Sequence, residues 1–203
     1  MTDSTNPDHH PYAPPQAPIA EQRATQPTPE FYVVSTGKFL LLFTATLGLY
    51  AVYWFYRHWQ AYKFHHAAPI WPIPRALFSI FFTHSLTGRI ETSLQASGRS
   101  VSSLSGMASL YVVFEIVSRI SSRLANRSIG WPYTDIVSLL SIIPIGIALL
   151  WMQNAANRAC ADEKGLSNRT LTVANYLWIG LGLLLWALAL FSLTLSPEDM
   201  ASF

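Results

Sequence analysis

The hydrophobic positions of this chain gather in long runs that are apolar over most of their length. Three of these runs cover residues 39–59, 136–152 and 173–195. A fourth run, residues 104–120, is also apolar but carries Glu115 and Arg119. A helix needs about 20 apolar residues to cross a hydrocarbon core roughly 30 Å thick. The pattern therefore predicts an all-α polytopic membrane protein with four transmembrane helices.

Local signals refine the ends of these predicted spans. Ser35 and Thr36 offer hydroxyls that would cap the first span, and Lys38 is expected at the water interface. In the third span Pro144 and Gly146 predict a kink, because proline removes a helical hydrogen bond.

A shorter apolar run, residues 76–86, lies between Arg75 and Arg89. Runs of this length are more typical of interfacial or re-entrant segments than of spans, so one short interfacial or re-entrant apolar helix is predicted. The connection before it, residues 60–75, contains three prolines, which we expect to rule out a regular helix there. The alternative is that residues 70–92 form a fifth span.

The chain divides into three regions by composition. Residues 1–30 are rich in proline and glutamine, lack apolar periodicity and are predicted to be a disordered tail rather than a signal peptide. Residues 31–197 hold the apolar runs and form the predicted helical membrane domain. Residues 198–203 make a short acidic tail.

Composition supports a membrane protein and excludes several other classes. Of the 203 residues 51% are hydrophobic and only 12% are charged, against about 25% charged in soluble domains. The net charge of +2 is too small, and its basic residues too dispersed, to indicate nucleic-acid binding. The single cysteine, Cys160, excludes an internal disulfide and a redox pair. No nucleotide, hydrolase or metalloprotease motif is present, so no cofactor and no catalytic residue is predicted.

Lysine and arginine positions suggest an orientation for the four predicted spans. One side of the membrane would hold Arg57, Lys63, Arg75, Arg89, Arg99, Arg158, Lys164 and Arg169. The other would hold Arg23, Lys38, Arg123 and Arg127 together with both chain termini. The richer side is expected to face the cytoplasm.

Two sets of intramembrane polar residues are candidates for function. Glu115 and Arg119 are four residues apart and share a helix face, so they either line an ion or proton path or form a structural ion pair. Four amides, Gln153, Asn154, Asn157 and Asn175, lie at the ends of the last two spans. They either bond neighbouring helices together or line a polar cleft.

Histidines and basic residues near the membrane face form a third set. The histidines are His58, His65, His66 and His84. Imidazole is a common ligand of metals and of haem iron, so these residues could form a metal or haem site. No carboxylate or cysteine stands at a recognised spacing from them. The favoured role is therefore interfacial, with Lys63, His65, His66 and Arg75 facing anionic lipid.

Several segments resemble a group of small bacterial inner-membrane proteins that has no established activity. The opening that carries the resemblance is Phe31-Tyr32-Val33-Val34-Ser35, Lys38-Phe39, Gly48-Leu49-Tyr50, Tyr53-Trp54-Phe55-Tyr56 and Trp59. Looser similarity follows in Ile73-Pro74-Arg75-Ala76-Leu77-Phe78 and in Gln153, Asn154, Asn157, Thr172, Asn175, Gly182 and Trp186. The resemblance implies a multi-pass protein of the bacterial inner membrane and carries over no chemistry.

The sequence favours a non-catalytic accessory or scaffold protein. Its expected partners are the lipid bilayer and either a larger membrane complex or further copies of the chain. Two alternatives stay open at this point. One is a small transporter or channel that uses Glu115 and Arg119, and the other is a redox or metal-binding subunit that uses the four histidines.

Overall fold

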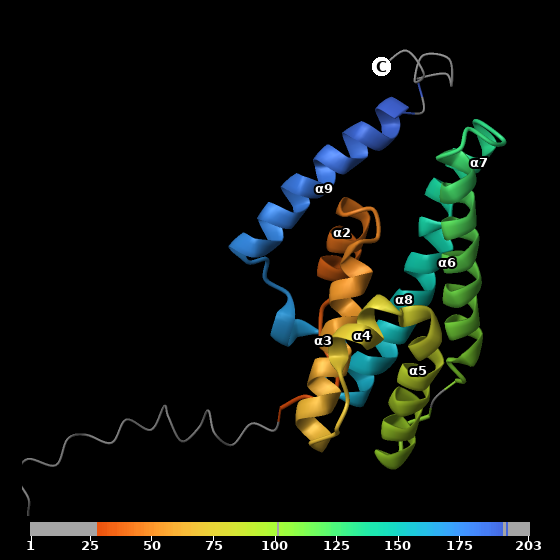
Figure 1. Ribbon diagram of the computed structural model, residues 1–203. Helices are drawn as coiled ribbons and strands as arrows, with labels where there is room; N and C mark the ends of the chain where they lie inside the picture. Colours follow the sequence, from red (N-terminus) through yellow and green to blue (C-terminus); the bar gives the residue numbers. More distant parts are fainter. Residues whose placement is uncertain (1–27, 101, 193, 195–203) are drawn as a thin grey trace, which may run out of the picture.

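The computed structural model describes residues 28–100, 102–192 and 194, and within this part the chain forms helices and no strand (Figure 1). The predicted all-α class is confirmed. The helices are α2 (Thr36–Ala45), α3 (Tyr50–His66), α4 (Pro72–Leu77), α5 (Ser79–Ala96), α6 (Ser105–Ala125), α7 (Tyr133–Leu140), α8 (Ile142–Ala159) and α9 (Val173–Ser192), with a 3-10 turn at Leu166–Asn168. Almost all of the predicted tail 1–30 and the acidic tail 198–203 lie outside the described residues.

Helices α2 and α3 form a hairpin, so the prediction of a single span over residues 39–59 is wrong. Leu47 and Gly48 adopt positive φ angles of 51° and 83°, and the Gly48 N–H donates to the Phe43 carbonyl at 2.9 Å. This is the Schellman end of a helix, in which Leu47 takes the left-handed position that glycine usually occupies and Gly48 follows it. Glu30, before α2, lies 2.7 Å from His66 at the end of α3. The segments that enter and leave the predicted span therefore lie at the same end of the molecule.

The molecule has two opposite ends, which hold different segments of the chain. The base is the end that holds Glu30, His66 and the loop after α8, and the apex is the end that holds the loop between α6 and α7. Figure 1 shows the base below and the apex above. Helix α6 runs from base to apex, α7 and α8 return, and α9 rises again to the apex, where Ser192 and Asn126 line one cavity. Residue 28 and Ser192 thus lie at opposite ends, whereas both termini were predicted on one side.

Two stretches of the described chain are long and apolar enough to cross a membrane, Tyr133–Ala159 and Val173–Ser192. Four such helices were predicted. The predicted span at residues 39–59 does not qualify, because it is a hairpin of two shorter helices. Helix α6 has the length, with 21 residues, but its composition is too polar, because it carries Glu115, Arg119 and Arg123.

Residues 60–75, for which no regular helix was predicted, contain the end of α3 and the start of α4. Pro72 begins α4, where a missing N–H is harmless because the first turn of a helix has no acceptor for it. The apolar run 76–86 is divided at Phe78 between α4 and α5, and α5 continues to Ala96. Neither helix qualifies as a span, so the five-span alternative is not supported.

The predicted kink before Pro144 appears as a break at one residue. Helix α7 ends at Leu140 and α8 begins at Ile142, with Ser141 between them. Pro144 has no N–H for the carbonyl of Leu140, which is the reason that the helix is interrupted here. Beyond the break, a Cβ on Gly146 would lie 2.8 Å from the Phe43 ring, so α8 packs closely on α2.

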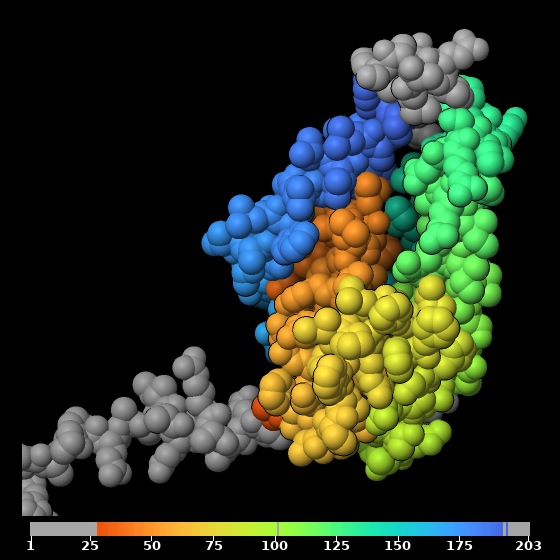
Figure 2. Space-filling view, in the orientation of Figure 1, coloured from red at the N-terminus to blue at the C-terminus, as the bar shows by residue number. Residues whose placement is uncertain are grey.

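The buried core lies between α2, α3, α5 and α8, and α9 lies outside it. The largest buried side chains include Trp54, Trp59, Leu149 and Met152. Figure 2 shows α9 on one side of α2 and the α6–α7 pair on the other. Helix α9 contacts α2 where Gly182 meets the backbone of residues 45–46 and where the indole N–H of Trp186 donates to the Thr44 carbonyl at 2.7 Å.

Candidate functional site

A buried amide network joins α8 to the extended segment before α2. The Gln153 side-chain NH2 donates to the Tyr32 carbonyl at 3.0 Å, and the Asn157 NH2 donates to the Val34 carbonyl at 2.9 Å. The Val34 N–H returns a bond to the Asn157 oxygen at 3.3 Å. Because a buried extended backbone needs partners for its polar groups, the two amides take the place of a neighbouring strand.

The same network continues into α3. The Gln153 side-chain oxygen accepts a bond from the Trp54 indole N–H and lies 3.2 Å from the His58 Nε2. Gln153, Asn157 and His58 are fully buried, so they bond segments together and do not line an open cleft. The other two predicted amides lie apart from them. Asn154 accepts a bond from Thr36, and Asn175 accepts two from Thr172 at the start of α9.

Burial of His58 makes stability depend on pH. Desolvation lowers the pKa of His58 from 6.5 to about 3. Between these two pH values His58 is protonated in the unfolded chain and neutral in the folded chain. Stability is therefore complete above about pH 6.5 and falls as the pH drops towards 3. Because of His58, we expect the free energy of unfolding to be about 2 kcal/mol lower at pH 5 than at pH 7.5. Unfolding in detergent at the two pH values measures this loss.

Two variants test that assignment. His58→Leu should be less stable at pH 7.5 but should lose less stability on acidification. His84→Gln should keep the full pH dependence, because His84 is exposed and its ring hydrogen-bonds to the Ser109 hydroxyl. An unchanged pH dependence in the His58 variant would contradict the assignment.

An apolar groove separates the start of α9 from the α2–α3 hairpin. Its volume is about 380 Å³. No charged residue lines it, and its walls are Leu42, Thr46, Leu49, Tyr50, Val52, Tyr53, Thr172, Ala174, Asn175 and Trp178. Helix α9 contacts α2 at Gly182 and Trp186, towards its middle, and the groove lies beside its first turns, at Ala174, Asn175 and Trp178. The first turns of α9 are therefore held away from α3.

A second cavity, of about 390 Å³, continues the groove towards the base and shares Tyr53, Thr172 and Asn175 with it. This second cavity is polar and contains Lys38 and Arg57. No carboxylate among the described residues forms an ion pair with either cation. Together the two cavities form one surface, the amphipathic groove, with an apolar half and a cationic half.

Arg57 is held in place by aromatic rings. Its guanidinium lies 5.1 Å from the centre of the Tyr32 ring and 5.7 Å from that of Tyr53, and it donates to the Tyr53 hydroxyl at 2.9 Å. Stacking of this kind orients a guanidinium while leaving other N–H groups available. Arg57 was not predicted as a site residue, although its position after an aromatic run is the signal that could have indicated it.

Lys38 is buried, which corrects its predicted place at the water interface. The ammonium donates to the Asn168 side-chain oxygen and to the Thr170 carbonyl, both at 2.8 Å. It therefore lies at the same end as the loop after α8, not on the opposite side as predicted. Desolvation lowers the pKa of Lys38, and the nearby positive charge of Arg57 lowers it further. The predicted helix cap is present, since the Ser35 hydroxyl accepts from the Lys38 N–H.

Glu115 and Arg119 form an ion pair within α6 at 3.1 Å. The Arg119 side chain is largely exposed, whereas the Glu115 side chain is mostly covered. Both residues border a small cavity of about 180 Å³ beside Tyr111. An exposed Arg119 and a cavity of this small size fit a structural pair better than a transport path.

The four histidines do not form one site. His58 is in the core and His84 contacts α6, whereas His65 and His66 lie together at the end of α3. Arg75 lies over the rings of Trp59 and Phe82 at 4.5 and 4.9 Å, and Lys63 lies half-buried near the end of α3. Among the residues described, His65 and His66 share a metal-compatible group with Glu30 alone.

No protein-family model, curated protein or solved structure matches this chain. The resemblance to small bacterial inner-membrane proteins therefore stays a prediction. Any functional interpretation rests on the geometry of the chain itself.

Proposed function

We propose that this chain is a small, non-catalytic integral membrane protein that binds an anionic phospholipid in the amphipathic groove. The observation that carries the proposal is the junction of an uncharged apolar groove with two cations, neither of which is paired with a carboxylate of residues 28–100, 102–192 or 194. A phospholipid has the same division, with an apolar chain beside an anionic phosphate. Arginine is well suited to a phosphate because its N–H groups can bond two oxygens at once.

The surface of α9 supports a membrane location. This 20-residue helix contains no charged residue, and very few of its side chains are buried. A core helix of a soluble protein would be mostly covered by its neighbours, and a large apolar patch exposed to water is unfavourable. Lipid is the solvent that such a helix needs, since apolar side chains around its whole circumference favour hydrocarbon.

Exposed apolar side chains also occur on the other long helices. They are Val113, Ile116 and Ile120 on α6, with Ile136, Leu140, Ile143, Ile147 and Trp151 on α7 and α8. A further set lies on α4 and the start of α5 and comprises Ile73, Leu77, Phe78 and Phe81. Helix α4 and the start of α5 fit an interfacial segment, because α4 is too short to span and the exposed Trp71 just before it is of a residue type that prefers the headgroup level.

The basic residues favour a cytoplasmic base. Lys38, Arg57, Lys63, Arg99, Arg158 and Lys164 belong to segments that meet there, whereas Arg123 and Arg127 lie near the apex. Positive residues are enriched on the cytoplasmic side of membrane proteins. The cationic half of the groove would then face the leaflet that is richest in anionic lipid.

The proposed role is that of an accessory protein. The groups that line the groove, two cations beside apolar side chains, are typical of a binding site. We propose that the protein acts in a bacterial inner membrane, bound to a larger membrane complex or to further copies of itself. The lipid would fill the space between α9 and the hairpin in that assembly.

Removal of the Arg57 charge tests the lipid proposal. The protein is purified in mild detergent, and its bound lipids are measured by mass spectrometry after addition of equal amounts of phosphatidylglycerol and phosphatidylcholine. Wild-type protein should retain phosphatidylglycerol preferentially. Arg57→Gln should lower that retention about tenfold, because a charge-assisted hydrogen bond contributes about 1.5–3 kcal/mol and 1.4 kcal/mol is tenfold.

Lys164→Gln is the matched control, because it removes the same charge from an exposed loop residue outside the groove. It should retain lipid as wild type does. Equal retention of the two lipids, or equal loss in the two variants, would overturn the proposed site, since either result indicates binding by overall charge or by apolar contact alone.

A further inference from the structure

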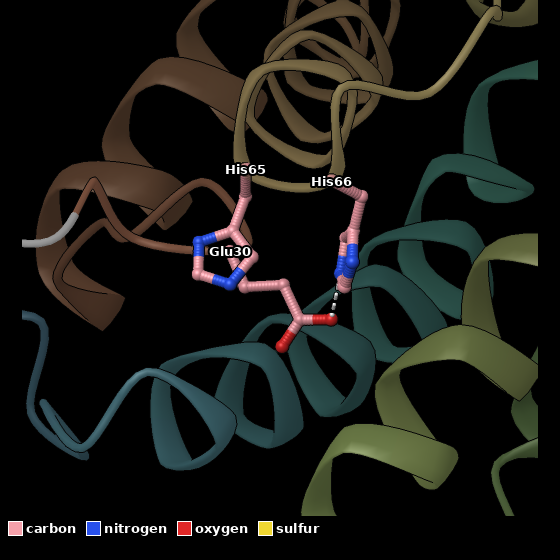
Figure 3. Close-up of side chains that lie close together, drawn as sticks. All are labelled: Glu30, His65 and His66. Atoms are coloured by element: carbon pink, nitrogen blue, oxygen red, sulfur yellow. Dashed lines mark hydrogen bonds and ion pairs between the residues drawn. The ribbon is translucent and has the colours of Figure 1, made fainter.

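Glu30, His65 and His66 come together at the base from two separate segments. Glu30 lies at the start of the extended approach to α2, and the two histidines are the last residues of α3. One ligand atom from each side chain lies within 4.8 Å of the others (Figure 3). The group is a consequence of the hairpin, because the turn at residues 46–49 returns α3 to the end at which the chain enters.

We propose that these three side chains bind a zinc ion. Two imidazole nitrogens and one carboxylate oxygen are a donor set that zinc uses in sites with three protein ligands and an open fourth position. Imidazole donors also distinguish the group from magnesium and calcium sites, which are built from oxygen ligands. The proposal is independent of the lipid groove, which none of the three residues lines.

Hydrogen bonds outside the group already orient two of the ligands. The His65 Nδ1 lies 2.8 Å from the Thr28 carbonyl. A carbonyl only accepts, so Nδ1 carries the proton and Nε2 carries the lone pair. Figure 3 shows the second ring nitrogen of His65 turned towards the Glu30 carboxylate. Histidines that bind metals are usually held in this way, with the distal N–H bonded to an oxygen.

The Glu30 carboxylate is held by one hydrogen bond from α5 and one contact with α3. The Ser93 hydroxyl on α5 donates to one Glu30 oxygen at 2.5 Å, and the other oxygen lies 2.7 Å from the His66 Nε2. The Glu30 side chain is largely covered, whereas His66 is exposed. An ion could therefore reach the group from water and replace the His66 proton without moving the carboxylate.

A neighbouring positive charge lowers the zinc affinity that we expect for this site. Arg89 lines the cavity beside Glu30 and His66, and its guanidinium stacks on the Tyr62 ring at 4.4 Å. Its positive charge opposes that of the ion, so the site should bind zinc more weakly than the same three ligands would without Arg89. When bound, zinc would link the segment before α2 to the end of α3.

The test uses full-length protein without a histidine tag, purified in detergent and freed of metal with a chelator. Titration with zinc chloride should give one ion per chain and should raise the melting temperature. His65→Ala and His66→Ala should each weaken binding at least tenfold. Glu30→Gln should weaken it as well while keeping the size of the side chain. Cobalt should give the visible absorption bands of a low-symmetry site in wild type, and these bands should be lost in the His65 variant.

Two controls decide between this site and the other histidines of the chain. His84→Ala removes an exposed histidine elsewhere, and the double variant His9→Ala, His10→Ala removes the pair that precedes the described residues. Both should bind zinc as wild type does. Binding that disappears with His9 and His10 but survives loss of His65 would overturn the proposal, as would the absence of stoichiometric zinc. Both His65 and His66 are exposed, and metal-free melting confirms that their variants are folded.

Discussion

Leu184→Lys in the middle of α9 should prevent stable insertion of that helix into the membrane. Leu184 is 57% exposed, so a lysine there would have little effect on a protein surrounded by water. A lysine at the centre of a transmembrane helix costs about 2.5–3.5 kcal/mol in insertion. We expect the variant to lose about a hundredfold in the insertion equilibrium, measured as the fraction of glycosylated or protease-protected reporter after α9.

The loop between α8 and α9 offers a matched control. Leu166 is 55% exposed, nearly the same as Leu184, but it lies in the 3-10 turn at the base. Leu166→Lys should leave insertion and protein level unchanged. If both variants behave as wild type and the wild-type protein is recovered from cells without detergent, α9 is not in a membrane and the proposed location is wrong.

Gln153→Leu should destabilise the fold by at least about 3 kcal/mol. Leucine keeps most of the volume of glutamine but leaves the Tyr32 carbonyl, the Trp54 indole N–H and the Asn157 oxygen without the Gln153 bonds. A buried polar group without a partner costs about 1–3 kcal/mol. We expect the melting temperature in detergent to fall sharply and the segment before α2 to become sensitive to protease.

Asn154 provides the control for this prediction, because it is the next residue on α8 but is exposed. Asn154→Leu should change the melting temperature little, since its bond to Thr36 is long, at 3.4 Å, and lies at the surface. Equal stability of the Gln153 and Asn154 variants would show that the buried network contributes little to the fold.

Sequence patterns predicted the elements whose signals are local. The apolar run 173–195 corresponds to α9, and the run 136–152 with Pro144 corresponds to α7 and α8 with their break. Prediction failed for the α2–α3 hairpin because Gly48 stands within a continuous apolar run. Hydropathy is the same whether the chain passes through such a run or turns back within it.

The candidate sites likewise depend on contacts between distant segments, which the sequence pattern does not indicate. Gln153 and Asn157 were recognised as amides that could join helices, but their partners are backbone groups of residues 32–34, which no pattern indicates. Arg57 and Lys38 share a cavity only because the loop after α8 returns to the start of α2. Glu30 precedes His65 by 35 residues, a separation at which no spacing rule applies.

The sequence by itself determined the all-helical class, the high apolar content and the identity of the two longest apolar helices, because these depend on composition and on residues close together in the chain. Only the tertiary structure decided that the first apolar run is a hairpin, that Lys38 is buried, and that Glu30 meets two histidines. These features depend on contacts between distant segments, whose free energy comes from packing and from the pairing of buried polar groups. A linear pattern contains neither.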